Sequence, residues 1–302
     1  MSWPQYDDLP PVDGMPKGCA WGVFDKDGEK DRWPIGAIRI PLIGRKGLVH
    51  RSTCFLDQPH EQLGFLGYDD EIEFNTQNSS HWDSLCHYLH QGTGQGYNGA
   101  EPTVHDLSQR RNTNATASLP TLEHWHTRGG LVGRGVLIDY KAYADANGIN
   151  YSPFSNHKIT ISDIEAVAVA QNVSFQAGDV FIVHTRYTEA LGCLSPNEQA
   201  KAMSSGCCVG IEGNEEAAKW FWNQGFSAVA GDQVAFEVFP FEKDVLHQYF
   251  LALFGLHIGE LWDLRTLSET CARLSRYTFF FTSVPLHVPG SVASPPNALA
   301  IF

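Results

Sequence analysis

Short apolar runs bounded by turn residues recur along the chain and are typical of buried strands. They predict strands over residues 37–42, 135–140, 179–185, 226–230 and 277–284. The second run reads GVLIDY and the third reads DVFIVHT, and both have the apolar character expected of central strands in a sheet.

Helix signals lie between these runs. Ser162 and Glu165 match the pattern of a capping box and are followed by apolar residues at helical spacing. The predicted helices lie at about 162–172, 215–224 and 242–254, and the last two end at Gly225 and Gly255. Helix and strand alternate, so the pattern predicts an α/β domain.

The first 35 residues have no sustained periodicity. They are rich in Pro, Gly, Asp and Trp, which predicts an irregular segment over residues 1–35 that packs on the domain through Trp3, Trp21 and Phe24. No internal repeat or linker divides the chain, so we expect one domain over residues 1–302.

Three further segments are predicted to be loops. A polar loop ends at residues 69–71, and the tail from Pro285 is rich in Pro, Gly, Ser and Asn. The glycine-dense stretch 92–99 lacks the Lys-Ser/Thr of a P-loop and the flanking elements of a dinucleotide fingerprint, so we expect it to form a flexible rim of a site.

Composition narrows the class of protein. With 302 residues, of which 43% are hydrophobic, the chain can bury a large core. The net charge of −13 disfavours nucleic-acid binding, and no apolar run reaches the ~18–20 residues of a membrane span. The seven cysteines lack C-x-x-C spacing and the N-terminus lacks the character of a signal peptide, so we expect a cytoplasmic protein without a disulfide framework.

The stretch 81–87, HWDSLCH, holds the main candidate chemistry. His81 and Asp83 stand two residues apart, so on a strand their side chains leave the same face and converge on one ion. His87 is near enough to lie beside that ion without binding it. Imidazole and carboxylate ligands suit Zn²⁺ or Mn²⁺. The alternative is that these are ordinary, satisfied core or surface residues.

Two later residues are candidates to complete the same site. His247 lies in the predicted helix 242–254, and Glu260 follows once the chain has turned back after Gly255. Two imidazoles and two carboxylates would then surround the ion. The alternatives are a core histidine on an apolar helix and a solvated carboxylate.

Aromatic residues flank the candidate ligands. Trp82, Tyr88 and Tyr97 are placed to stack on an aromatic or heterocyclic substrate, or else they fill the core. No G-x-S-x-G elbow is present, which disfavours a Ser-His-Asp hydrolase.

HWDSLCH resembles the second half of the H-x-G-T-H-x-D-x-P-x-H motif of the cyclase family, which includes enzymes of the kynurenine formamidase, isatin hydrolase and trans-dienelactone hydrolase type. GVLIDY, GDVFIVHT, AVAGDQVAFE and LHQYFLALFGLHIGELWDL are similar to their counterparts in the family and follow in the same order. The resemblance extends from about residue 69 to the C-terminus.

The resemblance implies a swivelling α/β/β fold and a divalent-metal hydrolase acting on an amide, lactam or lactone carbonyl. It implies that His81, Asp83, His247 and Glu260 bind the metal, that His87 acts as acid or base, and that Glu260 shares this catalytic duty. It also implies a small-molecule substrate and a homodimer or a dimer of dimers.

The chain departs from the motif at several positions. The first His falls on Gln77, the Gly-Thr pair is Ser79-Ser80, and the Pro is Leu85. A neutral amide is a weak ligand, so we predict one ion per chain, Mn²⁺ or Zn²⁺, with Gln77 among the substrate-binding residues. The region 31–62 looks shorter than in relatives. A non-catalytic binding protein, or a lyase or cyclase on the same fold, is therefore the alternative function.

Overall fold

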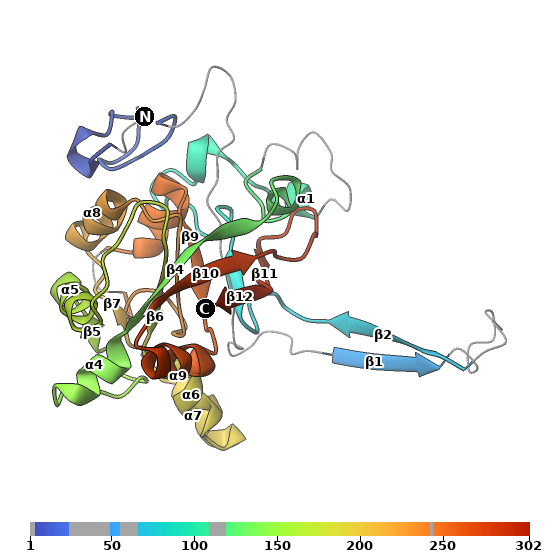
Figure 1. The fold of residues 1–302 in the computed structure, drawn as a ribbon. Coiled ribbons are helices and arrows are strands. Elements are labelled where there is room, and N and C mark those ends of the chain that lie inside the picture. Colours follow the sequence, from blue (N-terminus) through green and yellow to red (C-terminus); the bar gives the residue numbers. More distant parts are fainter. Residues whose placement is uncertain (1–3, 24–48, 55–65, 109–118, 242–243) are drawn as a thin grey trace.

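The computed structural model describes residues 4–23, 49–54, 66–108, 119–241 and 244–302 (Figure 1). The expected strand at 37–42 and the contacts expected of Trp3 and Phe24 lie outside these residues. In the described part of the chain, no helix has both the length and the apolar character needed to cross a membrane.

An eight-stranded mixed sheet forms the centre of the molecule, with the strand order β11-β3-β9-β8-β6-β4-β10-β12. Its middle strands β4, β6, β8 and β9 run parallel, whereas β3, β10, β11 and β12 pair antiparallel with their neighbours. The strands are β3 (His81–Asp83), β4 (Leu131–Asp139), β6 (Val180–His184), β8 (Ala228–Gly231), β9 (His257–Glu260), β10 (Thr278–Ser283), β11 (Ala293–Ser294) and β12 (Ala298–Ile301).

Helices cover the sheet on both faces. The helices are α1 (Val104–Leu107), α3 (His124–Thr127), α4 (Tyr140–Ala146), α5 (Ile161–Ala170), α6 (Tyr187–Gly192), α7 (Pro196–Ser204), α8 (Glu215–Gln224) and α9 (Arg265–Leu274), with 3-10 turns at Tyr6–Asp8 and Tyr97–Gly99 and a π-helix at Gln248–Phe254. Two small sheets, β1 (Val49–Cys54) with β2 (Tyr68–Glu73) and β5 (Lys158–Ile159) with β7 (Gly210–Ile211), lie outside the main one.

Alternation along the strands builds two hydrophobic clusters. On β4, Val136 and Ile138 point into the larger cluster, which also contains residues of α4, α5, α8 and the π-helix. Leu137 points the other way, into a cluster with Trp82, Trp125 and residues of α9 and β10. Because successive side chains of a strand face opposite sides, one strand supplies both clusters.

Several predicted elements are confirmed with shifted limits. The predicted strands at 135–140, 179–185, 226–230 and 277–284 correspond to β4, β6, β8 and β10, and the helix 215–224 is α8, which ends at Gly225 with φ +69°. The apolar character of these segments carried the correct prediction, because burial and periodicity agree there.

Other predictions were wrong. The cap of α5 is Thr160, whose hydroxyl accepts from the amide of Asp163, rather than the Ser162–Glu165 pair. The segment expected to be a polar loop up to residue 71 contains β2, and the tail after Pro285 contains β11 and β12. The exposed strand β2, with the sequence YDDEIE, carries too few apolar residues to be recognised from its pattern.

The N-terminal segment 4–23 packs on the rest of the domain, as expected. It is irregular apart from the 3-10 turn at Tyr6–Asp8. Tyr6 is buried and its hydroxyl donates to Glu215 at the start of α8 at 3.2 Å. The indole N–H of Trp21 donates to the carbonyl oxygen of Ala252 at 2.7 Å.

Candidate metal centre

Strand pairing brings the first ligand candidates together. His81 and Asp83 lie on β3 and are fully buried, and β3 pairs antiparallel with β9 so that His81 stands opposite Glu260. The Nε2 atom of His81 lies 2.5 Å from Oδ1 of Asp83 and 3.8 Å from Oε2 of Glu260. The three side chains each offer one ligand atom, and these atoms lie within 4.8 Å of one another.

The donor set fits a divalent cation. Oδ2 of Asp83 is buried and has no hydrogen-bond partner among the described residues, which is costly for a carboxylate oxygen unless a cation compensates it. One imidazole nitrogen and two carboxylate groups match the preferences of Zn²⁺ and Mn²⁺. The structure therefore supports His81, Asp83 and Glu260 as residues that could hold a metal ion.

His247 is held between two carboxylates at the edge of this group. Its Nε2–H donates to Oε1 of Glu260 at 2.9 Å and its Nδ1–H donates to Oε2 of Glu237 at 2.8 Å. Burial disfavours the charged imidazole, but Glu237 and Glu260 outweigh it and hold the pKa of His247 well above its ordinary range. His247 was expected to bind the metal, and the structure places it beside the group that could hold one, with Nε2 facing Glu260.

Gln77 and His87 lie on the other side of Asp83. The side-chain amide of Gln77 donates to Oδ1 of Asp83, and its nitrogen lies 3.3 Å from Nδ1 of His87. His87 Nδ1 is 3.6 Å from Oδ1 of Asp83, so His87 is next to the ligand group without belonging to it. Burial raises the pKa of Asp83, but His81 and His87 outweigh this effect and lower it overall.

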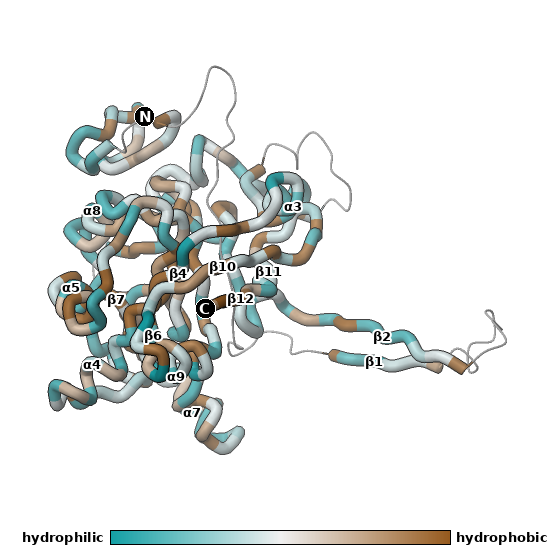
Figure 2. Tube along the Cα trace, in the orientation of Figure 1, coloured by the Kyte–Doolittle hydropathy of each residue, from teal (hydrophilic) through white to brown (hydrophobic). Residues whose placement is uncertain are grey.

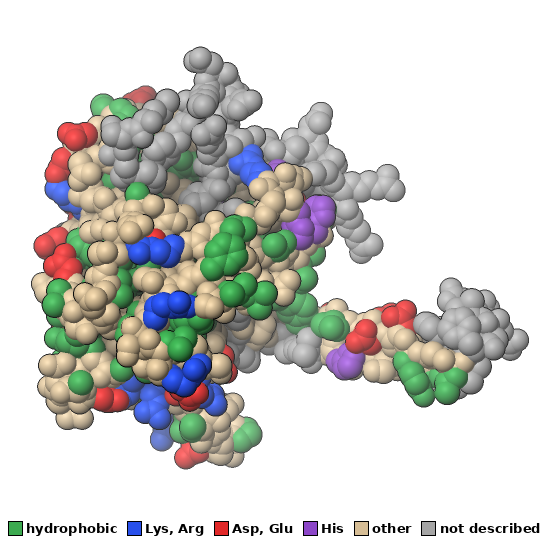
Figure 3. Space-filling model, in the orientation of Figure 1, with side chains coloured by type: hydrophobic (Ala, Val, Ile, Leu, Met, Phe, Trp, Pro, Cys, Tyr) green, Lys and Arg blue, Asp and Glu red, His purple; other side chains and the backbone are tan. Residues whose placement is uncertain are grey.

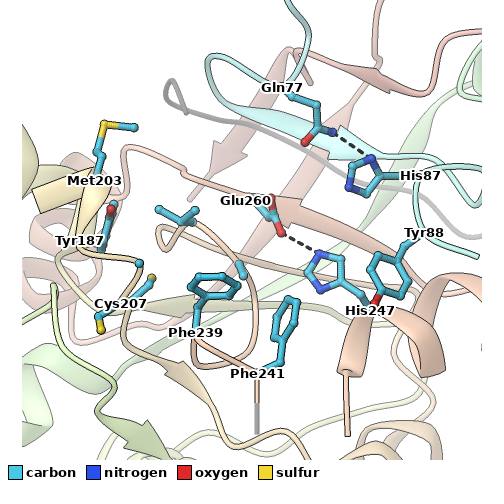
Figure 4. Close-up of a pocket in the computed structure, with 14 residues that line it drawn as sticks. Gln77, His87, Tyr88, Tyr187, Met203, Cys207, Phe239, Phe241, His247 and Glu260 are labelled. Atoms are coloured by element: carbon cyan, nitrogen blue, oxygen red, sulfur yellow. Dashed lines mark hydrogen bonds and ion pairs between the residues drawn. The ribbon is translucent and has the colours of Figure 1, made fainter. Parts of the chain in front are cut away.

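A cavity of about 320 Å³ opens in front of these groups (Figure 4). His87 is partly exposed to it, with 24% of its side chain accessible. The opposite wall is aromatic and sulfur-rich. The lining residues are Gln77, His87, Tyr88, Tyr187, Met203, Gly206, Cys207, Cys208, Val234, Ala235, Phe239, Phe241, His247 and Glu260.

Two of the three expected aromatic residues do not line this cavity. Trp82 is fully buried on the opposite face of β3, where its ring contacts Trp125 edge-on with the centroids 5.3 Å apart. Tyr97 is buried in the larger cluster and packs against Gly255. Tyr88 does line the cavity, whereas no residue of the 92–99 loop does. Strand alternation explains Trp82, because its neighbours His81 and Asp83 take the site face.

Glu237 and the aromatic wall were missed by sequence reasoning. Glu237 is buried and contacts His247 through both carboxylate oxygens, at 3.1 Å from the backbone amide and 2.8 Å from Nδ1. It lies within AVAGDQVAFE, a segment that the resemblance had already singled out, but nothing in its spacing marks a role. Phe239, Phe241 and Cys207 come from loops, and only tertiary structure brings them to the site.

Comparisons with known proteins bear on the family and the fold. A family profile described as putative cyclase matches residues 15–238. A solved structure described as a novel cyclase is similar to this chain, with 26% identity, a TM-score of 0.72, and coverage of 90% of this chain and 89% of the other. None of the curated proteins matches the chain in sequence.

Two isatin hydrolases share the fold at lower identity. Isatin hydrolase A from Labrenzia aggregata, bound to benzyl benzoate, has 12% identity and a TM-score of 0.54, with 83% of each chain covered. Isatin hydrolase A from Ralstonia solanacearum has 13% identity and a TM-score of 0.53, with 89% of this chain and 88% of the other covered.

The chain belongs to the putative cyclase family, and its curled α/β fold is the one expected from the resemblance. Family membership and the His81, Asp83 and Glu260 group together support a metal-dependent hydrolase at the level of the family.

Proposed function

We propose that this protein is a divalent-metal-dependent hydrolase that opens an amide, lactam or lactone carbonyl with water. The observation that carries the proposal is the convergence of His81, Asp83 and Glu260, of which Glu260 lines a cavity with an aromatic wall. The putative cyclase family and the fold shared with isatin hydrolases agree with it.

The ligand group would be His81, Asp83, His247 and Glu260. When bound, Zn²⁺ or Mn²⁺ supplies a Lewis acid that polarises a carbonyl and makes water more acidic. The buried carboxylates of Asp83, Glu237 and Glu260 concentrate negative charge at this point, which favours a cation.

His87 is the candidate acid or base. It lines the cavity, where a substrate would meet it, and its Nδ1 lies close to Gln77 and Asp83. It would take a proton from water and return it to the departing nitrogen or oxygen, an effect typically worth ~10²–10⁴-fold. Glu260 belongs to the ligand group, lies 2.9 Å from Nε2 of His247, and would share this proton transfer.

The cavity wall favours a neutral, flat substrate. Tyr88, Phe239 and Phe241 line it, and it has no Lys or Arg among its lining residues. An aromatic or heterocyclic ring would stack there while its carbonyl faces Gln77 and His87.

Metal content and turnover test the proposal together. Protein purified without chelator should contain one Zn²⁺ or Mn²⁺ per chain by mass spectrometry, and it should hydrolyse at least one member of a panel of aromatic formamides, lactams and lactones. EDTA should abolish turnover, and re-addition of metal should restore it. His81→Ala should remove both metal and turnover with an unchanged circular dichroism spectrum, whereas His90→Ala, outside the site, should retain both. Turnover by ion-free protein would contradict the proposal.

A binding protein without hydrolase activity is the second candidate, and one observation favours it. The amide of Gln77 donates to Asp83, a ligand candidate, at the position where the resembled motif has an imidazole. Metal binding without turnover of any hydrolase substrate would support this function, and release of an unsaturated product would instead indicate a lyase or cyclase.

A further inference from the structure

Strand β3, which carries His81 and Asp83, has few backbone partners. It is three residues long and pairs with β9 at two positions, the last of them Trp82 with Gly259. On its other side it pairs with β11, again at two positions. Each hydrogen bond of a ladder adds only a modest net free energy, so the position of Asp83 at the end of β3 depends on contacts beyond the ladder.

His257 of β9 supplies such a contact. Its Nδ1 lies 2.8 Å from the carbonyl oxygen of Asp83. A carbonyl oxygen only accepts, so Nδ1 carries the proton and donates it. The amide of Ser84 donates to Val292 beside β11 at 2.8 Å, and neighbouring residues of a strand turn their backbone groups to opposite sides. The carbonyl of Asp83 therefore faces β9, where His257 continues the contact beyond the ladder.

His257 contacts Asp83 from behind the candidate metal centre. Side chains alternate along β9, so His257 leaves the face opposite to that of Glu260. Its imidazole meets the ring of Trp125 edge-on, with the centroids 5.1 Å apart, and Trp125 belongs to the hydrophobic cluster that contains Trp82. His257 is therefore placed to hold the backbone of a ligand and not to bind the ion itself.

The ring of His257 is supported from two directions. β9 pairs in parallel with β8, where His257 stands opposite Ala228. Trp125 lies in α3, and just before α3 the amide of Leu122 donates to the carbonyl of Ser291, just before β11, at 3.1 Å. α3 and β11 accordingly lie near the same end of the sheet (Figure 2). Because β9 and α3 are both tied into the sheet, the imidazole is a fixed point for the end of β3.

An imidazole is an unfavourable choice for this position unless its hydrogen bond matters. Histidine side chains lie on the surface elsewhere, as on the hairpin of β1 and β2 (Figure 3), but His257 is only 1% exposed. Its Nε2 is buried and has no hydrogen-bond partner among the described residues. An apolar side chain of similar size would avoid this cost, which indicates that the imidazole is present for its bond to Asp83.

We propose that His257 is a positioning residue that sets the place of Asp83 in the metal centre. Oδ1 of Asp83 lies 2.5 Å from Nε2 of His81 and 3.6 Å from Nδ1 of His87, so a shift of its backbone would change both relationships. Partners behind metal ligands typically alter metal affinity ~10–100-fold. The inference rests on the proposed metal-dependent function, because it concerns a ligand of that site.

Metal affinity tests the proposal without any need for turnover. His257→Leu keeps an apolar side chain in the core but removes the N–H donor, so competition with a chromophoric chelator should show the affinity for Zn²⁺ or Mn²⁺ reduced ~10–100-fold. His257→Asn returns an N–H donor at the branch position of Nδ1 and should restore most of the affinity. Val167→Ala, in the core beneath α5, is the control for lost packing and should bind metal like the parent chain.

Kinetics separate positioning from a general structural role. At saturating metal, His257→Leu should lower kcat with KM unchanged, because His257 does not line the cavity. Circular dichroism and the unfolding midpoint establish that each variant is folded.

The possible failures can be told apart. Equal metal affinity in the parent chain and His257→Leu, or no recovery in His257→Asn, overturns this inference and leaves the proposed function intact. Metal binding without turnover overturns only the hydrolase proposal, and a parent chain that binds no metal overturns both.

Discussion

Glu237 accepts two hydrogen bonds from His247, one from the backbone amide at 3.1 Å and one from Nδ1 of the imidazole at 2.8 Å. The pair fixes the start of the π-helix and the orientation of the ring, so that Nε2 points at Glu260. Carboxylates behind a ligating histidine raise its basicity and set its orientation.

Removing the charge of Glu237 should weaken metal binding. Glu237→Gln keeps the size of the side chain but loses the carboxylate that orients His247, so the affinity for Zn²⁺ or Mn²⁺ should fall ~10–100-fold. Competition with a chromophoric chelator measures the change. Glu212→Gln, a half-buried carboxylate paired with Lys158, is the matched control and should leave the affinity unchanged.

Metal should stabilise the fold through Asp83. A cation that binds only the folded chain adds about 2.7 kcal/mol at a hundred times its dissociation constant, which a thermal unfolding scan detects as a higher midpoint. In Asp83→Asn, the metal-dependent rise should vanish, and the metal-free midpoint should fall, because His81 and Gln77 lose the buried carboxylate that pairs with them. An undiminished rise in this variant would exclude Asp83 as a ligand.

Gln77 should limit the number of bound ions. Its side-chain amide donates to Oδ1 of Asp83 and lies beside His87, where an imidazole would add a ligand nitrogen. Gln77→His should therefore raise the metal content from one ion per chain towards two, measured by mass spectrometry after dialysis. An unchanged content of one ion would show that other residues set the stoichiometry.

The aromatic wall should govern substrate binding. Phe241→Ala removes a ring that lines the cavity, and stacking of this kind contributes ~0.5–1.5 kcal/mol. KM for aromatic substrates should rise ~2–10-fold with little change in kcat, whereas aliphatic lactones should be unaffected. Phe280→Ala, which removes an exposed ring on the outer sheet face, is the control.

A buried imidazolium should make stability depend on pH. His184 lies at the end of β6 between Asp139 and Glu189, at 3.0 Å from each carboxylate. Burial disfavours its charge, but the hydrogen bonds to Asp139 and Glu189 prevail and raise its pKa to about 10. Its contribution is thus fully present below the unfolded value of ~6.5 and is lost as pH rises through about 10.

Urea unfolding at a series of pH values measures this effect. Near pH 6, His184→Gln should lower the free energy of unfolding by ~3–5 kcal/mol, because the buried carboxylate of Asp139 and the half-buried one of Glu189 lose their cation. The variant should also lose the decline in stability between pH 6.5 and 10 that the parent chain shows. His287→Gln, at an exposed position, should behave like the parent chain.

Local pattern was sufficient for the buried elements. Apolar runs located β4, β6, β8 and β10, and Gly225 marked the end of α8, because buried strands and αL glycines have sharp local signatures. Local pattern did not predict strand β2, because its six residues are all exposed and do not alternate between buried and exposed positions.

The candidate site could likewise be predicted from local sequence only in part. The spacing of His81 and Asp83 predicted that both face one side of a strand, and the same rule, applied to Trp82, would have removed it from the cavity. Glu237, Phe239 and Phe241 had no local signal, because their roles depend on partners far away in the sequence or on loop geometry.

The sequence by itself determined the alternation of buried strands and helices, the paired facing of His81 and Asp83, and the resemblance to the cyclase family, since each depends on near neighbours or on residue order. Only the tertiary structure decided that Glu260 stands opposite His81, that Glu237 holds His247, and that the hairpin of β1 and β2 projects into solvent. These relationships join residues through strand register and packing, which no local pattern encodes.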